Sequence, residues 1–149
     1  MQLKAIKETK NLTFYVPDTS YEMELTFVEG GITAGFPSPA DDFKEVRISL
    51  DKTLVKNGDA TFYARVRGQS MINAGIDDGD LLIVDKSLEP QNNKIAVCFL
   101  DGEFTVKRLK VEKNVIFLMP ENADYKPIKV TQDNELVIWG VVTYVIKRV

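Results

Sequence analysis

The stretch KIAVCFLDGEFTVKRLKV, residues 94–111, decides what kind of fold this chain can form. Two apolar runs flank the dipeptide Asp101-Gly102, and each run has the length and composition of a strand. Asp-Gly supplies the two positive φ angles that a tight type I′ turn requires. We therefore predict a β-hairpin whose turn is Asp101-Gly102.

Strand patterns continue before this hairpin. In ATFYARVR, residues 60–67, alternation places Phe62, Ala64 and Val66 on one face of a strand. DLLIVD, residues 80–85, is a short apolar run bounded by turn residues, which is typical of a buried strand. Residues 50–56 favour a short helix, and a further helical turn is expected at residues 70–74.

Two more strands follow the hairpin. They are expected in NVIFLMP, residues 114–120, and in ELVIWGVVTYVIKRV, residues 135–149, where the second needs a bend near Gly140. A chain of 149 residues suits one core rather than two ordinary domains. Many short strands and little helix predict a compact, mainly β domain with mostly antiparallel strands.

The N-terminal part of the chain has a different character. NLTFYVP, residues 11–17, and MELTFV, residues 23–28, have the composition to pair as strands. Gly, Pro, Ser and Asp are common in the residues around them, which favours an extended, movable arm. Within this arm, Ala34-Gly35 joins two small residues that a protease groove would accommodate easily, although alone the pair is only part of a loop.

Charge and hydropathy exclude several classes of partner. A net charge of -3 argues against tight, direct binding to nucleic acid, which needs clustered basic residues. The dense basic cluster KRLK, residues 107–110, lies inside a strand pattern and favours a solvated strand face. The chain contains no apolar run of the roughly 18 residues that span a bilayer, no basic amphipathic helix and no secretory signal pattern. We expect a cytoplasmic protein that binds no membrane.

The residue counts restrict the chemistry further. The chain has no histidine, which excludes a Ser-His-Asp triad, a Cys-His dyad and any histidine-ligated metal site. The single cysteine, Cys98, lies in an apolar run and is expected to be a packed core thiol rather than a nucleophile. A catalytic base must then be Asp, Glu, Lys, Tyr or water.

Ser70 lies in GQSMINAGIDDGD, residues 68–80, between the alternating strand and the expected helical turn. One interpretation is that Ser70 caps this turn, as serine commonly does. A compatible interpretation is that its hydroxyl acts as a nucleophile while its own backbone N–H donates to the oxyanion. DDGD, residues 77–80, lacks the ligand spacing of an EF-hand and is interpreted as a turn before the next strand.

Without histidine, a serine nucleophile can take its base from a lysine, provided that the lysine is neutral. From a usual value of about 10.4, the lysine pKa must fall by roughly three units, a difference of about 4 kcal/mol. Period-two alternation places Lys107 on one face with Thr105, Leu109 and Val111, whose apolar groups would desolvate the ammonium. A solvated lysine at a strand edge remains the alternative.

Taken together and in this order, ITAGFPSPADDF (residues 32–43), GQSMINAGIDDGDLLIVD (residues 68–85) and DGEFTVKRL (residues 101–109) resemble the LexA/UmuD family of self-cleaving serine-lysine proteins. The resemblance extends from about Gly35 to the C-terminus and implies the fold of that family's protease domain. It further implies that Ser70 is the nucleophile and Lys107 the general base.

The resemblance implies self-cleavage between Ala34 and Gly35, either within one chain or on the partner chain of a dimer. Residues 1–34 would be the arm that is removed, and residues 35–149 the β-rich protease and polymerase-interaction domain. It also implies no cofactor, stimulation by a RecA filament on single-stranded DNA, and a shortened homodimer that acts with an error-prone Y-family DNA polymerase in translesion synthesis. Contact with DNA would then be indirect.

Three other functions are compatible with parts of the pattern. A LexA-type repressor would need a DNA-binding domain before the cut, and residues 1–34 contain no pattern for a basic helix pair. A signal peptidase shares Ser-Lys chemistry but should carry a membrane anchor. In a noncatalytic interaction module, Ser70 would be only a cap and Lys107 only a surface charge.

Overall fold

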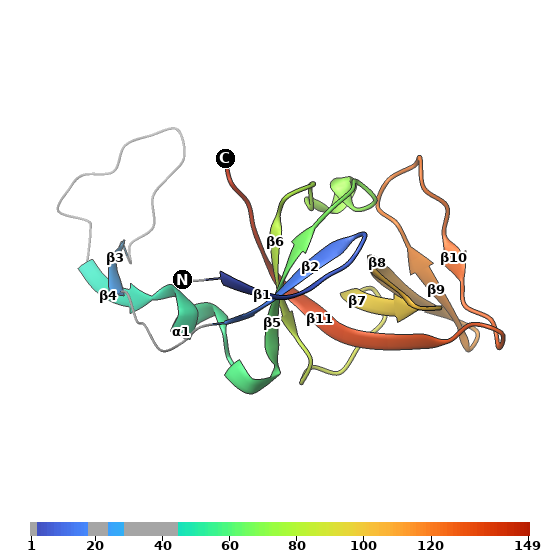
Figure 1. The fold of residues 1–149 in the computed structure, drawn as a ribbon, viewed down its shortest axis with the longest axis horizontal. Coiled ribbons are helices and arrows are strands. Elements are labelled where there is room, and N and C mark those ends of the chain that lie inside the picture. The colour runs from blue at the N-terminus through green and yellow to red at the C-terminus, as the bar shows by residue number, and fades with distance from the viewer. Residues whose placement is uncertain (1–2, 18–23, 29–44) are drawn as a thin grey trace.

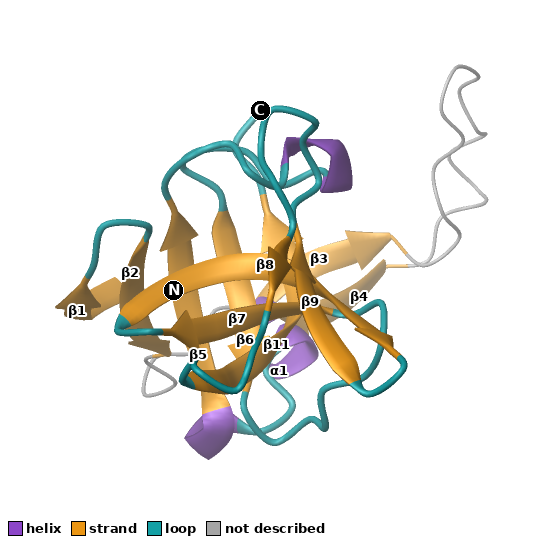
Figure 2. Ribbon diagram, turned by 90° about the vertical axis from the view of Figure 1, so that its right-hand side faces the viewer, coloured by secondary structure: helices purple, strands orange, loops and turns teal. Residues whose placement is uncertain are grey.

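Strands make up most of the described chain, as the sequence predicts. The computed structural model describes residues 3–17, 24–28 and 45–149. Strands predominate in the ribbon (Figure 2), and every strand pair among the described residues is antiparallel. The strands are β1 (Leu3–Glu8), β2 (Leu12–Pro17), β3 (Glu24–Val28), β4 (Glu45–Ser49), β5 (Thr61–Val66), β6 (Leu81–Asp85), β7 (Ile95–Leu100), β8 (Glu103–Glu112), β9 (Val115–Met119), β10 (Ile128–Lys129) and β11 (Leu136–Ile146). The predicted mainly β, mostly antiparallel fold class is confirmed.

Nine strands form one sheet in the order β1-β2-β5-β6-β11-β7-β8-β9-β10, while β3 and β4 form a separate two-stranded ribbon. This β3–β4 ribbon projects from one end of the body (Figure 1). In the described part of the chain, three short helical segments accompany the strands: α1 (Leu50–Leu54), η2 (Gly58–Ala60) and η3 (Ile72–Ala74). No helix in the described ranges is both long and apolar enough to cross a membrane.

The hairpin of residues 94–111 forms as predicted. β7 and β8 pair with Leu100 opposite Glu103. The two residues between them, Asp101 and Gly102, have φ values of 49° and 88°. Both values lie in the left-handed region that a type I′ turn requires. This turn therefore fixes the register that places Lys107 opposite Ala96 on β7.

The long strand β11 lies between β6 and β7 and is irregular near Gly140, as predicted. Its register against β7 shifts between Ile138 and Gly140. A Cβ atom on Gly140 would lie 2.5 Å from Cγ1 of Val84, so a side chain at this position would force the Val84 side chain to move. Glycine at residue 140 lets the two strands approach closely.

Both faces of β5 are packed near its start. Ala64 and Val66 belong to the larger core. The Phe62 ring packs against that of Trp139, with 4.7 Å between the ring centroids. Tyr63, on the opposite face, is fully buried in a second core. The predicted alternation is confirmed, and the structure adds that the second face is also covered.

The N-terminal segment is organised differently from the expected extended arm. NLTFYVP and MELTFV do form strands, but they do not pair with each other: β2 pairs with β1 and β5, whereas β3 pairs with β4. The reason is the buried apolar face of β2, where Leu12 and Phe14 are each 1% exposed. Ala34 and Gly35 lie outside the described residues.

Candidate active site

Ser70 lies in the loop between β5 and η3, and hydrogen bonds with a distant segment of the chain fix the position of this loop. The Glu121 N–H donates to the Ser70 carbonyl at 2.8 Å, and the Asn73 N–H donates to the Glu121 carbonyl at 2.8 Å. Asn122 Nδ2 donates to the Gln69 carbonyl at 2.8 Å. The residues on both sides of Ser70 are therefore tied to the segment that follows β9.

Ser70 does not cap the following helical turn. The N-cap residue of η3 is Met71, and no side chain caps this turn. The Ser70 hydroxyl instead accepts a hydrogen bond from Lys107 Nζ at 3.0 Å. The capping interpretation is wrong because the 3₁₀ turn begins one residue later than a cap at Ser70 would require.

Lys107 lies on β8 and is only 6% exposed. Besides Ser70, its Nζ donates to Thr105 Oγ1 at 2.8 Å and to the Val106 carbonyl at 3.1 Å. The prediction that KRLK forms a solvated strand face is therefore wrong for Lys107. It is right for Lys110, whose side chain is 48% exposed. Leu109 is buried as expected, but Val111 is 48% exposed, so the expectation that Val111 helps to desolvate Lys107 is wrong. The difference between the two lysines follows their position along β8, whose residues are exposed from Lys110 onward.

Burial lowers the pKa of Lys107 from its usual value of 10.5. Burial also raises the pKa of the nearby Cys98 thiol to about 12. Cys98 is therefore uncharged at neutral pH and offers the amine no negative partner. The expectation that Cys98 is a packed core thiol is confirmed, because its side chain is 0% exposed in the core beneath β7.

The three oxygens around Lys107 Nζ can accept three N–H groups from an ammonium, and loss of one proton reverses a single contact. A neutral amine has two N–H groups and one lone pair, whereas a hydroxyl both donates and accepts. When Thr105 Oγ1 and the Val106 carbonyl take the two N–H groups, the lone pair faces the Ser70 hydroxyl at 3.0 Å. A proton can then pass directly from Ser70 Oγ to Lys107 Nζ.

A hollow of about 130 Å³ opens at this pair. Its lining includes Ser70, Lys107 and Tyr125, together with Asn11 and Leu12 from the N-terminal hairpin. Among the residues that the structure describes, the Ser70 N–H donates to no other group. A larger hollow of about 570 Å³ lies over β6 and β11 and contains neither residue of the pair.

The DDGD segment is a turn, as predicted, and leads directly into β6. The Asp80 N–H donates to the Asp77 carbonyl at 3.1 Å, and Gly79 has a φ of 88°. Lys147 Nζ donates to the carboxylates of both Asp77 and Asp80. Within the described ranges, no group of three or more His, Cys, Asp and Glu side chains could hold a metal ion.

Three contributors to the site were not assigned a role from the sequence. Thr105 carried a readable signal, because period-two alternation places it on the same face as Lys107. Asn11 and Glu121 carried no such signal in the sequence. Each lies at the site because segments far apart in the chain are paired there.

Comparison with known proteins gives this geometry its context. The Peptidase S24-like family model matches residues 26–143. The chain belongs to the peptidase S24-like family. It is a UmuD-like member of the LexA/UmuD group within that family of self-cleaving serine peptidases, as the resemblance predicts, and a protein of SOS mutagenesis.

Its similarity to curated relatives covers most of each chain. It is 44% identical over 114 residues to protein MucA of Salmonella typhimurium, which covers 76% of this chain and 77% of MucA. It is 40% identical over 115 residues to protein ImpA of Escherichia coli, with 77% and 78% covered. Protein SamA of Salmonella typhimurium is 41% identical over 115 residues, with 77% and 79% covered.

Proposed function

We propose that Ser70 is the nucleophile and Lys107 the general base of a self-cleavage reaction between Ala34 and Gly35. The observation that carries this proposal is the 3.0 Å contact between the buried Lys107 Nζ and Ser70 Oγ. Burial lowers the lysine pKa, and its hydrogen-bond partners are all uncharged oxygens. These are the conditions under which an amine can serve as a base near neutral pH.

In the first half of the reaction, Ser70 Oγ attacks the Ala34 carbonyl carbon while its proton passes to Lys107 Nζ. The Ser70 N–H donates to the oxyanion that forms. The Ala34–Gly35 C–N bond then breaks, and Lys107 gives its proton to the Gly35 nitrogen. The products are a new N-terminus at Gly35 and an ester between Ala34 and Ser70.

In the second half, a water molecule attacks this ester and Lys107 accepts its proton. The ester bond breaks, and Lys107 returns the proton to Ser70 Oγ. The result is two fragments, residues 1–34 and residues 35–149. Because the substrate is part of the same chain, tethering raises its effective concentration and a deep binding pocket is unnecessary.

A tethered bond beside a competent base would be cut at once, so the uncut chain must keep the bond in a nonproductive position for most of the time. We propose that a RecA filament on single-stranded DNA increases the productive fraction, which is a population shift. The fragment of residues 35–149 would then act as a homodimer with an error-prone Y-family DNA polymerase in translesion synthesis. An acidic chain suits contact with DNA through these proteins rather than directly.

Two alternatives have weaker support. A LexA-type repressor reads DNA through helices before the cut, whereas the described residues before Ala34 include the strands β1, β2 and β3 and no helix. A noncatalytic module would leave Ser70 as a cap and Lys107 as a surface charge. The N-cap at Met71 and the 6% exposure of Lys107 both oppose it.

The test is intact-mass analysis of purified protein, incubated with and without a RecA filament and nucleotide. The parent is expected to yield a fragment beginning at Gly35, faster with the filament and faster at alkaline pH. Ser70→Ala and Lys107→Ala should remain uncut, whereas Lys110→Ala, which changes an exposed lysine of the same strand, should behave as the parent does. If Ser70→Ala fragments as fast as the parent, a contaminating protease explains the cleavage and the proposal fails.

A further inference from the structure

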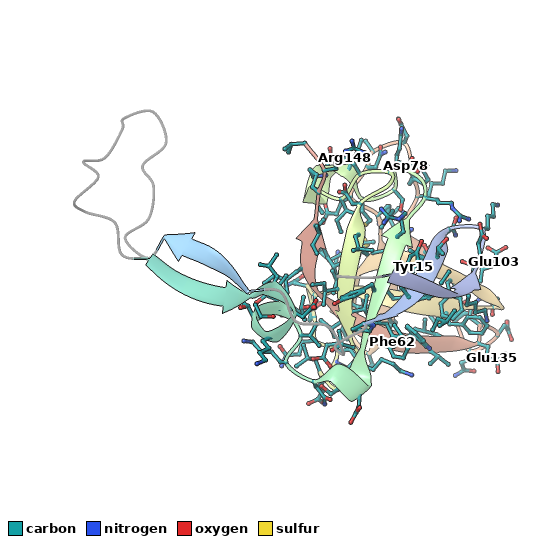
Figure 3. All side chains as sticks on the ribbon, turned by 60° about the vertical axis from the view of Figure 1, so that its left-hand side comes forward. Tyr15, Phe62, Asp78, Glu103, Glu135 and Arg148 are labelled. Carbon is teal, nitrogen blue, oxygen red and sulfur yellow. The ribbon has the colours of Figure 1, made fainter. Side chains whose placement is uncertain are left out.

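The N-terminal hairpin, β1 and β2, precedes the proposed cut but belongs structurally to the body that follows it. β2 pairs with β5 through four residue pairs, from Leu12 opposite Val66 to Tyr15 opposite Tyr63. Figure 3 shows β2, with Tyr15 labelled, lying along the body rather than away from it. An added strand of this kind binds mainly through its backbone and gains selectivity from alternate side chains.

Two side chains of β2 anchor the hairpin in the core. Leu12 and Phe14 are each 1% exposed, and they lie two residues apart on the same face of the strand. The Phe14 ring centroid lies 4.8 Å from that of Phe104 and 4.8 Å from that of Trp139. The hairpin therefore covers an aromatic surface that β8 and β11 supply.

Polar contacts hold the hairpin turn against the rim of the hollow at Ser70. Asn11 Nδ2 donates to the Phe104 carbonyl at 2.9 Å, and the Arg67 N–H donates to the Asn11 carbonyl at 2.9 Å. The Arg67 guanidinium donates to the Thr9 carbonyl at 2.8 Å and to Glu8 Oε1 at 2.6 Å. None of these contacts depends on the peptide bond between Ala34 and Gly35.

The β3–β4 ribbon spans the proposed cut in the same way. β3 precedes Ala34-Gly35 and β4 follows it, and the two strands pair through five residue pairs, from Glu24 opposite Ser49 to Val28 opposite Glu45. A cut between β3 and β4 therefore leaves two separate sets of strand pairing, β2 with β5 and β3 with β4, between its two products.

We propose that the N-terminal fragment remains bound after cleavage, so that the immediate product is a protein of two chains held together by strand pairing. The site that binds it is the edge of β5 together with the rings of Phe104 and Trp139. Its ligand is an extended peptide with leucine and an aromatic residue two positions apart. This inference rests on the proposed function for the position of the cut, although retention itself requires only a break between β3 and β4.

If the N-terminal fragment is retained, cleavage of the bond and exposure of the surface beneath the fragment become two separate events. Breaking the bond frees the Gly35 amine, but the edge of β5 and the aromatic surface become accessible only when the fragment leaves. Asn11 and Leu12 also line the hollow at Ser70, so departure of the fragment removes part of its wall. Dissociation of the fragment is therefore the step that exposes a new surface to partners.

Native mass spectrometry and size-exclusion chromatography of the cleaved full-length protein test this proposal. We expect a complex heavier than the uncut chain by one water, which separates into two fragments only under denaturing conditions. To make the test independent of self-cleavage, the same measurement is made on a Ser70→Ala chain with a recognition sequence for an unrelated protease inserted between residues 29 and 44. If the fragments separate at about 10 μM protein in this chain, retention is wrong even where self-cleavage is right.

Substitutions in the hairpin give a graded test on the protease-cut Ser70→Ala chain. Phe14→Ala should raise the dissociation constant of the fragment at least about a hundredfold, because it leaves a cavity among buried rings. Ile6→Ala is the matched control, since Ile6 lies on the same hairpin but is 52% exposed, and its effect should stay within about threefold. Near-UV circular dichroism before cutting checks the fold, and Phe14→Leu replaces Phe14→Ala if that variant does not fold. Equal dissociation constants for the parent and the position-14 variant would overturn the assigned binding site.

Discussion

Two lysines of this chain, Lys107 and Lys147, are placed in opposite electrostatic environments. Each donates hydrogen bonds from Nζ to more than one oxygen. The partners of Lys107 are two hydroxyls and a carbonyl, all uncharged, and the residue is 6% exposed. The partners of Lys147 are the carboxylates of Asp77 and Asp80, and its side chain is 37% exposed.

The two pKa values consequently shift in opposite directions. Burial lowers the pKa of Lys107, and hydrogen bonds to Asp77 and then Asp80 raise the pKa of Lys147. The comparison teaches that the number of hydrogen bonds does not decide whether a lysine can act as a base. Loss of water without a compensating negative charge favours the neutral amine.

Removing the amine of Lys107 should have the largest effect. Lys107→Met keeps a side chain of similar length, and we expect self-cleavage to slow by about a hundred- to ten-thousandfold, the usual contribution of a general base. Intact-mass time courses measure the rate, and thermal unfolding should show a midpoint no lower than that of the parent, because a buried polar group has been removed. A variant that cuts at the parental rate would remove Lys107 from the mechanism.

Giving Lys107 a carboxylate partner should make it resemble Lys147. In Thr105→Asp, the residue that accepts from Nζ at 2.8 Å becomes negatively charged, which should raise the lysine pKa by about one to three units and slow cleavage at pH 7 by about ten- to a thousandfold. The rate should recover at higher pH. Thr105→Asn, which carries no charge, is the control, and an identical loss in both variants would point to geometry rather than charge.

The pH dependence of the parent sharpens the same comparison. Below its pKa, the neutral fraction of Lys107 rises about tenfold for each pH unit, so the cleavage rate should rise by the same factor. The rate should level off below the usual lysine value of 10.5, because burial lowers the pKa. Rates measured by intact mass from pH 6 to pH 10 check this, with Ser70→Ala as the uncut control. A flat or falling profile would contradict a lysine base.

Removing Lys147 should have the smallest effect on chemistry. Lys147→Met breaks the contacts with Asp77 and Asp80, yet the amine lies outside the hollow at Ser70, and the cleavage rate should stay within about twofold of the parent. The variant is assayed beside Lys107→Met under identical conditions. Equal losses in the two would mean that the difference between the lysines has no bearing on catalysis.

Local sequence signals account for much of the fold. Asp101-Gly102 specified its hairpin because both residues must adopt positive φ angles, and the turn then set the register of β8. The irregularity near Gly140 was predictable because a strand of that length rarely stays straight. Such features depend on residues close together in the chain, which is where sequence patterns are informative.

The partners of β2 could not be predicted in the same way. Leu12 and Phe14 mark an apolar face, but nothing near them indicates that the face would be buried against β5. The same holds for the site. Ser70 and Lys107 were candidates because of their residue types and the family resemblance. The hydrogen bond from Glu121 to Ser70 and that from Asn11 to Phe104 depend on pairing between distant segments, which no local pattern indicates. Long-range pairing is a property of the assembled fold rather than of a local pattern.

The position of β11 has a consequence for how a newly made chain matures. Ser70 follows β5 and Lys107 lies on β8, and within the sheet these strands belong to two blocks that β11 joins by pairing with β6 on one side and β7 on the other. β11 comes after every other described strand in the chain. A ribosome therefore translates both partners of the pair well before it supplies the strand that bridges their blocks, and a partly synthesised chain lacks the continuous sheet that sets one block beside the other.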